Sequence, residues 1–172
     1  FPSSPVNGQI FNNMKFDSTL GVWKKSDDIV VDQINVTENP QFLGQGALNF
    51  VSASGTGILK SKTVHVNMNN AYNTSTGEFT CPVEGNYLCY FDALILTPNA
   101  TSYAACYFYK NEVQFSGACH SMHDIIRPYE PLFLSTVIYA NAGDKLSLYF
   151  GSYDGCVIYN SDYCKLGFTF IN

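Results

Sequence analysis

The sequence predicts an all-β protein, a sandwich of about ten short strands. Aromatic residues make up 15% of the 172 residues and alternate with other residues instead of following a helical period, which favours strands. Clusters of Gly, Pro, Asn and Asp separate the apolar runs, as turns between strands do. A chain of this length can bury one core, so we expect one main domain.

The first part of the chain is expected to be an arm. Residues 1–20 contain two prolines and no sustained period, so we expect them to be irregular, without a fold of their own. Residues 21–25 and 29–36 are strand-like, and the second run alternates as a half-buried edge strand does. Trp23, the only tryptophan, is expected to pin the arm onto the domain. An exposed ligand-stacking residue is the alternative.

Residues 39–46 are punctuated by Pro and Gly, which predicts a linker. We therefore place a boundary after residue 46. The arm, residues 1–46, would add one or two strands packed on a globular domain at residues 47–172. The arm contains neither a Gly-X-Y repeat nor heptads, so we expect no collagen stalk and no coiled coil there.

The stretch from Asn67 to Phe91 organises the domain. Turn residues divide it into three extended pieces. In the last piece, which begins near Tyr87, alternate positions are apolar on both sides, so it predicts a central strand covered on both faces. Strands are expected near residues 87–96, 103–110, 115–121, 132–140, 145–151 and 165–171.

This stretch also carries a family resemblance. Its spacing is similar to the signature of the globular head of complement component 1q, a family related in fold to tumour necrosis factor, at Asn67, Tyr72, Phe79, Gly85, Tyr87, Cys89 and Phe91. Ser61 and Cys89 depart from the family, which usually has Phe at both positions. Similar segments follow at residues 107–111, 132–148 and 167–170. The resemblance covers about residues 47–172 and implies a ten-stranded jelly roll that forms a homotrimer.

Charge and hydropathy exclude two classes of partner. The net charge of −5 and the absence of a basic stripe argue against nucleic acid, which needs clustered Lys and Arg. No apolar run approaches the roughly 18 residues that span a bilayer. Only 13% of the residues are charged, so we expect hydroxyls, amides, glycans or a partner subunit to cover the surface.

Several features predict a secreted protein. The chain begins with Phe1 and not with Met, which we interpret as a mature chain after removal of a signal peptide. Asn35, Asn73 and Asn99 each begin an Asn-X-Ser/Thr sequon in a polar, turn-like context, where a glycan would be exposed. Six cysteines, an even number, favour an oxidising compartment.

Three cysteine pairs are considered. A four-residue loop at residues 111–114 would place Cys106 directly opposite Cys119, within the separation that a disulfide needs. Cys156 and Cys164 would close a loop between the last two strands. For the remaining two, Cys81 and Cys89, both a buried bond and two buried thiols stay open.

The sequence offers little chemistry for catalysis. His120, His123 and Asp124 form one cluster of metal-ligand residue types, but a zinc site normally has three or four protein ligands and the residues lie in an expected loop. No catalytic motif is present, so we expect no enzyme. By the resemblance, acidic loop residues could bind calcium with backbone oxygens, as some family members do at the trimer apex: Asp124, Asp154 and Asp162.

Tyrosines beside small polar residues point to recognition. Tyr combines a flat apolar face with a hydroxyl at low entropy cost, which suits sugars and polar protein surfaces. We predict the ligand site in the loop at residues 152–163, on Tyr153, Asp154, Tyr159, Asp162 and Tyr163. With the resemblance, this predicts a secreted, trimeric, lectin-like or pattern-recognition protein whose partner is an extracellular glycan or protein. The alternatives are a structural matrix or secretion component and a cytokine-like receptor ligand.

Overall fold

The computed structural model describes residues 3–4, 6, 10–11, 14–25, 40–47, 55–116, 119–122, 129–159 and 161–171. The chain divides into two compact units, residues 1–38 and 39–172, which we describe one at a time. No peptide bond in the described residues is cis.

The first unit contains a small antiparallel sheet of three strands, β1 (Ile10–Phe11), β2 (Met14–Asp17) and β3 (Val22–Lys25). Asp17 closes the β2–β3 turn, since its Oδ1 accepts hydrogen bonds from the N–H groups of Thr19 and Leu20 at 3.0 and 3.2 Å. The strand at residues 21–25 is thus confirmed, whereas the expectation that residues 1–20 are irregular is wrong at β1 and β2. The strand predicted at residues 29–36, the Asn35 sequon and the Trp23 side chain lie outside the described part.

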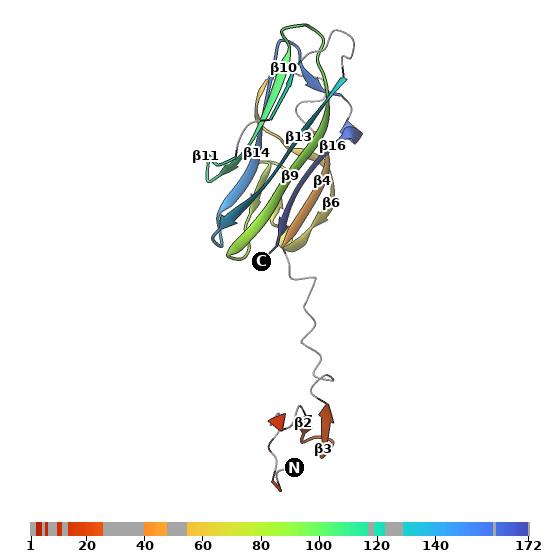
Figure 1. Ribbon diagram of the computed structural model, residues 1–172, viewed down its shortest axis with the longest axis vertical. Coiled ribbons are helices and arrows are strands. Elements are labelled where there is room, and N and C mark those ends of the chain that lie inside the picture. The colour runs from red at the N-terminus through yellow and green to blue at the C-terminus, as the bar shows by residue number, and fades with distance from the viewer. Residues whose placement is uncertain are drawn as a thin grey trace. The chain divides into compact units, whose positions relative to one another are not determined.

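The second unit is a sandwich of two antiparallel sheets, seen in Figure 1. The β9 sheet has the order β13-β9-β16-β4-β6, with β15 also paired to β9. The bounds of its strands are β4 (Gln41–Ala47), β6 (Ser61–Asn67), β9 (Gly85–Leu96), β13 (Tyr129–Ala140), β15 (Val157–Ile158) and β16 (Cys164–Phe170). Short 3-10 turns cover Met68–Asn70 and Ser161–Tyr163.

The β14 sheet forms the other layer, in the order β11-β10-β14-β8-β7, with β12 paired to β10 and β5 to β14. Its strands are β5 (Thr56–Ile58), β7 (Tyr72–Asn73), β8 (Glu78–Thr80), β10 (Tyr103–Lys110), β11 (Val113–Gln114), β12 (Cys119–Met122) and β14 (Lys145–Tyr153). The predicted all-β jelly-roll sandwich is confirmed.

Aromatic side chains fill the space between the sheets. The alternating residues of β9 from Tyr87 to Ile95 are buried there, which confirms a central strand between β13 and β16. Phe168 of β16 packs against Phe79 and Phe42, with ring centroids 5.3 and 6.2 Å apart. These rings join strands of both sheets, so the core depends on the full sandwich.

The domain begins earlier than predicted. Residues 39–46 are not a linker, because β4 pairs with both β16 and β6 and its Phe42 stacks on Tyr72 at 3.7 Å. Gly44, one of the two glycines that indicated a loop, serves a close approach: a Cβ there would lie 2.3 Å from Oγ of Ser61. The boundary therefore lies at residues 38/39 and not after residue 46.

The β10–β11 hairpin corrects one prediction and confirms another. Its turn has two residues, Asn111 and Glu112, both with positive φ, and not the four that we predicted. Cys106 nevertheless faces Cys119, because the register shifts along the hairpin. Cys119 lies five positions after Gln114, whereas their partners on β10, Cys106 and Tyr109, are only three positions apart. Oγ of Ser116 accepts a hydrogen bond from the Phe108 N–H there, at 2.9 Å. The facing of the cysteines was right, although the turn was wrong.

Replacing Glu112 by Gly is expected to stabilise the protein by about 0.5–1 kcal/mol. Glu112 has φ of +67° and is exposed, and a side chain is strained in this conformation whereas Gly is not. Part of the gain is offset by the greater freedom of Gly in the unfolded chain. Urea unfolding measures the change. Glu112→Ala, which keeps Cβ, should give no gain, and a destabilised Glu112→Gly protein would show that the turn conformation is wrong.

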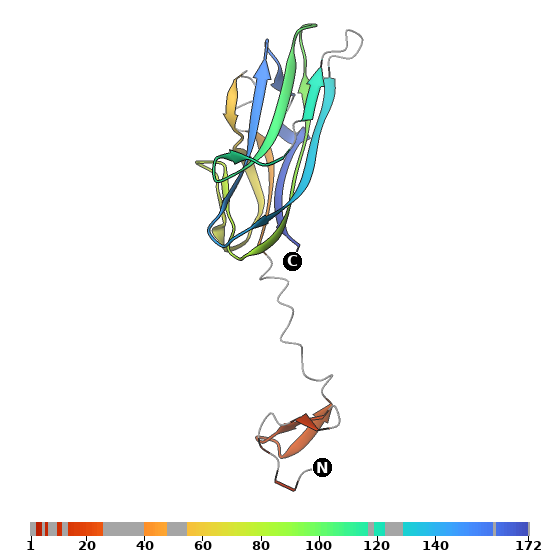
Figure 2. The same ribbon diagram turned by 60° about the vertical axis from the view of Figure 1, so that its left-hand side comes forward.

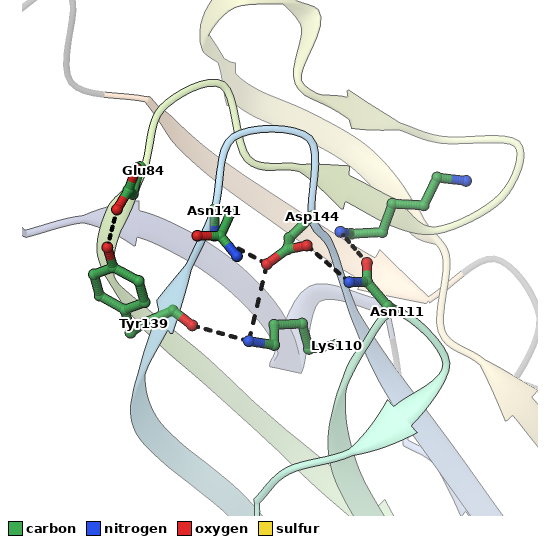
Figure 3. Close-up of polar contacts among 7 residues, drawn as sticks. Glu84, Lys110, Asn111, Tyr139, Asn141 and Asp144 are labelled. Atoms are coloured by element: carbon green, nitrogen blue, oxygen red, sulfur yellow. Dashed lines mark hydrogen bonds and ion pairs between the residues drawn. The ribbon is translucent and has the colours of Figure 1, made fainter.

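A polar network joins the turns at the end of the sandwich where the C-terminus lies (Figure 3). Asp144 accepts hydrogen bonds from Nδ2 of Asn111 at 2.8 Å and from the Asn141 N–H at 2.9 Å. Nζ of Lys110 lies 3.9 Å from the same carboxylate and donates to the Tyr139 carbonyl. The hydroxyl of Tyr139 donates to Glu84. The network fixes the β13–β14 turn against the β10–β11 hairpin.

The network predicts a pH dependence. The hydrogen bond from Asn111, and next the one from the Asn141 N–H, lower the pKa of Asp144. A carboxylate with a depressed folded-state pKa stabilises the fold above its unfolded pKa and loses this contribution as pH falls through the folded value. Asp144→Asn should therefore be less stable than the parent at pH 7. The difference should shrink below about pH 3.9, the ordinary pKa of an aspartate. Thermal melts across pH measure it, and a constant difference would contradict the assignment.

Candidate functional site

The outer face of the β9 sheet exposes apolar side chains. On β13, the edge strand of this sheet, alternate residues point outward, and Phe133, Val137 and Tyr139 are 61%, 53% and 51% exposed. Antiparallel register places Val137 beside Leu88 and Pro131 beside Leu94 on β9. We call this surface the assembly face, formed by Pro131, Phe133, Val137 and Tyr139 of β13, Leu88, Tyr90, Asp92 and Leu94 of β9, and Lys165 and Thr169 of β16.

The middle of the assembly face is flat. Tyr90 lies across Gly167 of β16, where an added Cβ would be only 2.1 Å from the ring. Half-burial raises the pKa of the Tyr90 hydroxyl. Asp92 and Lys165 are directly opposite each other on β9 and β16 and bring opposite charges to the face. The surface is thus apolar, with one position where a negative and a positive side chain lie side by side.

The predicted ligand residues fall into two groups. Tyr159 and Tyr163 lie together, with ring centroids 6.2 Å apart, and Tyr159 also meets Tyr129 at 4.5 Å. Tyr153 belongs elsewhere, because it stacks on Tyr103 on the outer face of the β14 sheet. The structure therefore does not bring the five predicted residues into one site.

A hollow of about 360 Å³ lies where the 152–163 loop meets the assembly face. Its lining residues come from the loop, β9, β13 and β16: Asp92, Ala93, Leu94, Pro131, Asp162, Tyr163 and Lys165. Nε2 of Gln45 donates a hydrogen bond to the Asp162 carbonyl at 3.1 Å and fastens this loop to β4. An exposed tyrosine ring, two carboxylates and an ammonium group around an apolar floor can orient a polar ligand.

Asp154 has a role that the sequence did not predict. Its carbonyl accepts hydrogen bonds from Oγ of Ser102 at 2.6 Å and Nδ2 of Asn99 at 3.3 Å, and its carboxylate accepts one from the Thr101 hydroxyl. Asp154 thus ties the two loops at this end of the sandwich together. The sequon Asn99-Ala-Thr101 was a visible signal of a polar loop, but nothing in the sequence connected it to Asp154.

Metal binding stays a prediction. Within the part of the chain that the structure describes, no three His, Cys, Asp or Glu side chains come together in a group that could hold a metal. Two of the three aspartates predicted for calcium lie in different surroundings: Asp154 accepts hydrogen bonds from Thr101 and Ser102, and Asp162 lines the hollow. The third, Asp124, lies outside the described residues, as do His123 and the side chain of His120.

The cysteines outside the β10–β12 pair are buried thiols. Cys156 and Cys164 do not form the predicted disulfide. Val157 faces Leu96 and Cys164 faces Ala93 along one edge of β9, so Cys156 and Cys164 lie about 13 Å apart along the strand, beyond the reach of a disulfide. Burial raises the pKa of each of these thiols to about 12.

Cys81 and Cys89 are likewise two buried thiols, the alternative that the sequence left open. Burial is the main cause that raises the pKa of both, that of Cys81 to about 12. Cys106 and Cys119 face each other, and their disulfide stays a prediction.

Comparison with known proteins identifies the family. The C1q domain model matches residues 48–162, about two thirds of the chain, so the chain belongs to the C1q domain family. The globular domain of zebrafish complement 1qA is 18% identical, with a TM-score of 0.54 over 77% of this chain and 95% of that one. No curated protein matches the chain.

Two structures from the tumour necrosis factor side of the fold are also similar. Murine APRIL at pH 8.5 is 12% identical, with a TM-score of 0.57 over 78% of this chain and 100% of that one. Eiger TNF from S. frugiperda is 14% identical, with a TM-score of 0.52 over 78% and 93%. These likenesses show the fold. Domains of this family are typically trimeric, extracellular and non-enzymatic. Among the described residues no helix is long and apolar enough to cross a bilayer.

Proposed function

We propose that the protein is a secreted, non-enzymatic binding protein that acts as a homotrimer with lectin-like or pattern-recognition activity. The proposal of a trimer rests on the assembly face. An edge strand that exposes Phe133, Val137 and Tyr139 in one row is a surface that soluble monomers rarely leave open. A cyclic assembly covers three such faces and closes, so that no face remains to polymerise.

The composition of the face supports self-association. Burying a Val or Phe side chain contributes about 1.5–3 kcal/mol relative to leaving it exposed, and each subunit offers several. Asp92 and Lys165 lie opposite each other in register, so each subunit brings a negative and a positive side chain side by side to the face, and neither charge has to be buried alone. In a cyclic trimer each interface joins two different parts of the surface, and the apolar row of one subunit is covered by its neighbour.

The ligand site of this proposal is the part of the hollow that lies outside the assembly face, at Asp162 and Tyr163. The rest of its lining includes Asp92, Leu94, Pro131 and Lys165, which belong to the assembly face. The 56% exposed ring of Tyr163 offers an apolar face to a sugar ring, while the Asp162 carboxylate beside it offers acceptors to the sugar hydroxyls. The hydrogen bond from Gln45 to the Asp162 carbonyl holds this segment in place, which lowers the ordering cost of binding.

A glycan array, run with and without chelator, tests the binding activity. The parent should bind short glycans, and Tyr163→Ala and Asp162→Ala should each weaken binding about tenfold while the protein stays trimeric. Loss of binding on chelation would add calcium to the site. A parent that binds no glycan but binds cells would favour the receptor-ligand alternative, and one that binds neither would favour the structural one.

Covalent modifications give a separate prediction for protein from a secretory host. Non-reduced peptide mapping should recover Cys106 joined to Cys119, because they occupy facing positions. It should also recover a glycan on Asn73, which is exposed and whose Oδ1 accepts hydrogen bonds from the Ser75 and Thr76 N–H groups. Recovery of Cys106 as a free thiol, or of Asn73 without glycan, would contradict the respective part.

A further inference from the structure

The outer face of the β14 sheet carries a row of tyrosines. β10 and β14 pair in antiparallel register and run side by side through the sheet (Figure 2). Five outward positions on these two strands are tyrosines, at Tyr103, Tyr107 and Tyr109 of β10 and Tyr149 and Tyr153 of β14. We call this surface the tyrosine face. It lies on the layer opposite the assembly face, so the proposed trimer leaves it open to solvent.

The rings are arranged in two groups. Tyr103 and Tyr153 stack with centroids 4.3 Å apart and planes at 14°, while Tyr109 and Tyr149 approach to 5.2 Å at 36°. Ala105 and Gly151 face each other between the groups. Both small residues are buried, and the Tyr153 ring lies 3.3 Å from the place of a Cβ on Gly151.

The hydroxyls of the five tyrosines make no hydrogen bond to any residue that the structure describes. Tyrosines of the core differ: Tyr87 donates to the Val83 carbonyl at 2.7 Å, and the Tyr72 hydroxyl accepts from the Ser61 N–H at 3.1 Å. The tyrosine face thus combines apolar ring surface with several hydroxyl groups that are available to an external partner. A partner rich in hydroxyls can use both.

A groove of about 270 Å³ lies at the β11 end of the tyrosine face. Tyr109, Tyr149 and Ile58 supply its apolar lining. Nζ of Lys145 and Oε2 of Glu78, 3.1 Å apart, form an ion pair on its rim. A second carboxylate, Glu112, and the polar side chains of Asn111 and Ser147 complete the lining, so the groove offers several donors and acceptors beside the rings and a net negative charge.

We propose that the tyrosine face binds an extended, neutral glycan chain, with the groove as its anchoring subsite. The chain's net charge of −5 and the single cation at the groove disfavour anionic polysaccharides and nucleic acid. Available hydroxyls and the polar rim favour a polar ligand over an apolar protein surface, and the second carboxylate, Glu112, adds to the charge that disfavours an anionic one. A row of rings along two paired strands suits a chain longer than the short glycans proposed for the loop end.

This inference rests on the proposed carbohydrate binding and adds a second surface to it. Affinity electrophoresis in hydroxyethyl cellulose and in galactomannan, with alginate as the anionic comparison, tests it. The parent should be retarded by at least one neutral polysaccharide and not by alginate. Tyr109→Ala and Tyr149→Ala should each weaken binding about tenfold, while Tyr149→Phe, which keeps the ring, should retain most of it.

Two controls separate folding from binding. Val113→Ala changes an exposed side chain of the same hairpin that points away from Tyr109 and should bind as the parent does. Lys145→Ala removes an exposed rim group without touching the core and should weaken binding about threefold to tenfold. If a thermal melt shows that Tyr149→Ala does not fold, Lys145→Ala still tests the proposal.

The outcomes distinguish the two proposals. A parent that no neutral polysaccharide retards, or one that prefers alginate, overturns the inference. So does full binding by Tyr109→Ala, Tyr149→Ala and Lys145→Ala. If those variants bind polysaccharide normally while Tyr163→Ala loses the short glycans of the array, the proposed function stands without the tyrosine face. If they form assemblies different from the parent's, the face contacts protein and the inference is also overturned.

Discussion

Val137→Glu is expected to convert the trimer into monomers at micromolar concentration. Val137 is 53% exposed in the single chain, in the row of the assembly face beside Leu88. A trimer would bury three new carboxylates in an apolar interface, and each costs several kcal/mol. The expected result is a dissociation constant raised at least about a hundredfold. Light scattering coupled to gel filtration measures the mass.

The matched control is Val113→Glu. Val113 is 68% exposed and lies on β11, an edge strand of the other sheet, so this variant should remain a trimer. Both variants should melt cooperatively, because neither side chain is in the core. A trimeric Val137→Glu protein would place the interface on another surface.

Phe168→Ala is expected to lower the free energy of unfolding by about 3–5 kcal/mol. Phe168 is fully buried and its ring contacts those of Phe42, Phe79 and Phe108 at 6.2, 5.3 and 6.0 Å. Removing the ring leaves a cavity that spans both sheets, and rigid strands can close it only partly. The loss is a large part of the stability of an ordinary domain.

Urea unfolding at one fixed protein concentration measures this effect, since assembly also contributes to stability. Phe168→Leu, which keeps most of the volume, should lose less than half as much. A loss below about 1 kcal/mol for Phe168→Ala would mean that the aromatic centre of the core is misplaced.

The sequence predicted the centre of the fold well because its signals there are local. The alternation from Tyr87 to Ile95 shows a buried strand directly, and the turns on either side of it are marked by Gly, Pro and Asn. Cys106 faces Cys119 as expected, although a two-residue turn and a two-residue shift replaced the predicted four-residue loop. The predicted pairing of the two cysteines was correct because the shorter turn and the two-residue shift cancel each other.

The failures come from contacts between distant residues. Gly44 looks like a loop residue in the sequence, and only its pairing with Leu166 of β16 and Val64 of β6 shows that it belongs to a strand. Cys156 and Cys164 are close in sequence, yet both lie along one edge of β9, too far apart to bond. Tyr153 and Tyr163 are close in sequence, but Tyr153 ends β14, which pairs with β10, whereas Tyr163 directly precedes β16, which pairs with β9. Their rings therefore belong to separate aromatic groups.

The mass of the unmodified protein in solution shows whether a trimer covers the exposed row on β13. Light scattering at micromolar concentration should give three times the 19.1 kDa of the chain, plus any glycans, without change on dilution by tenfold. A mass of one chain at the same concentration would show that the assembly face does not hold subunits together.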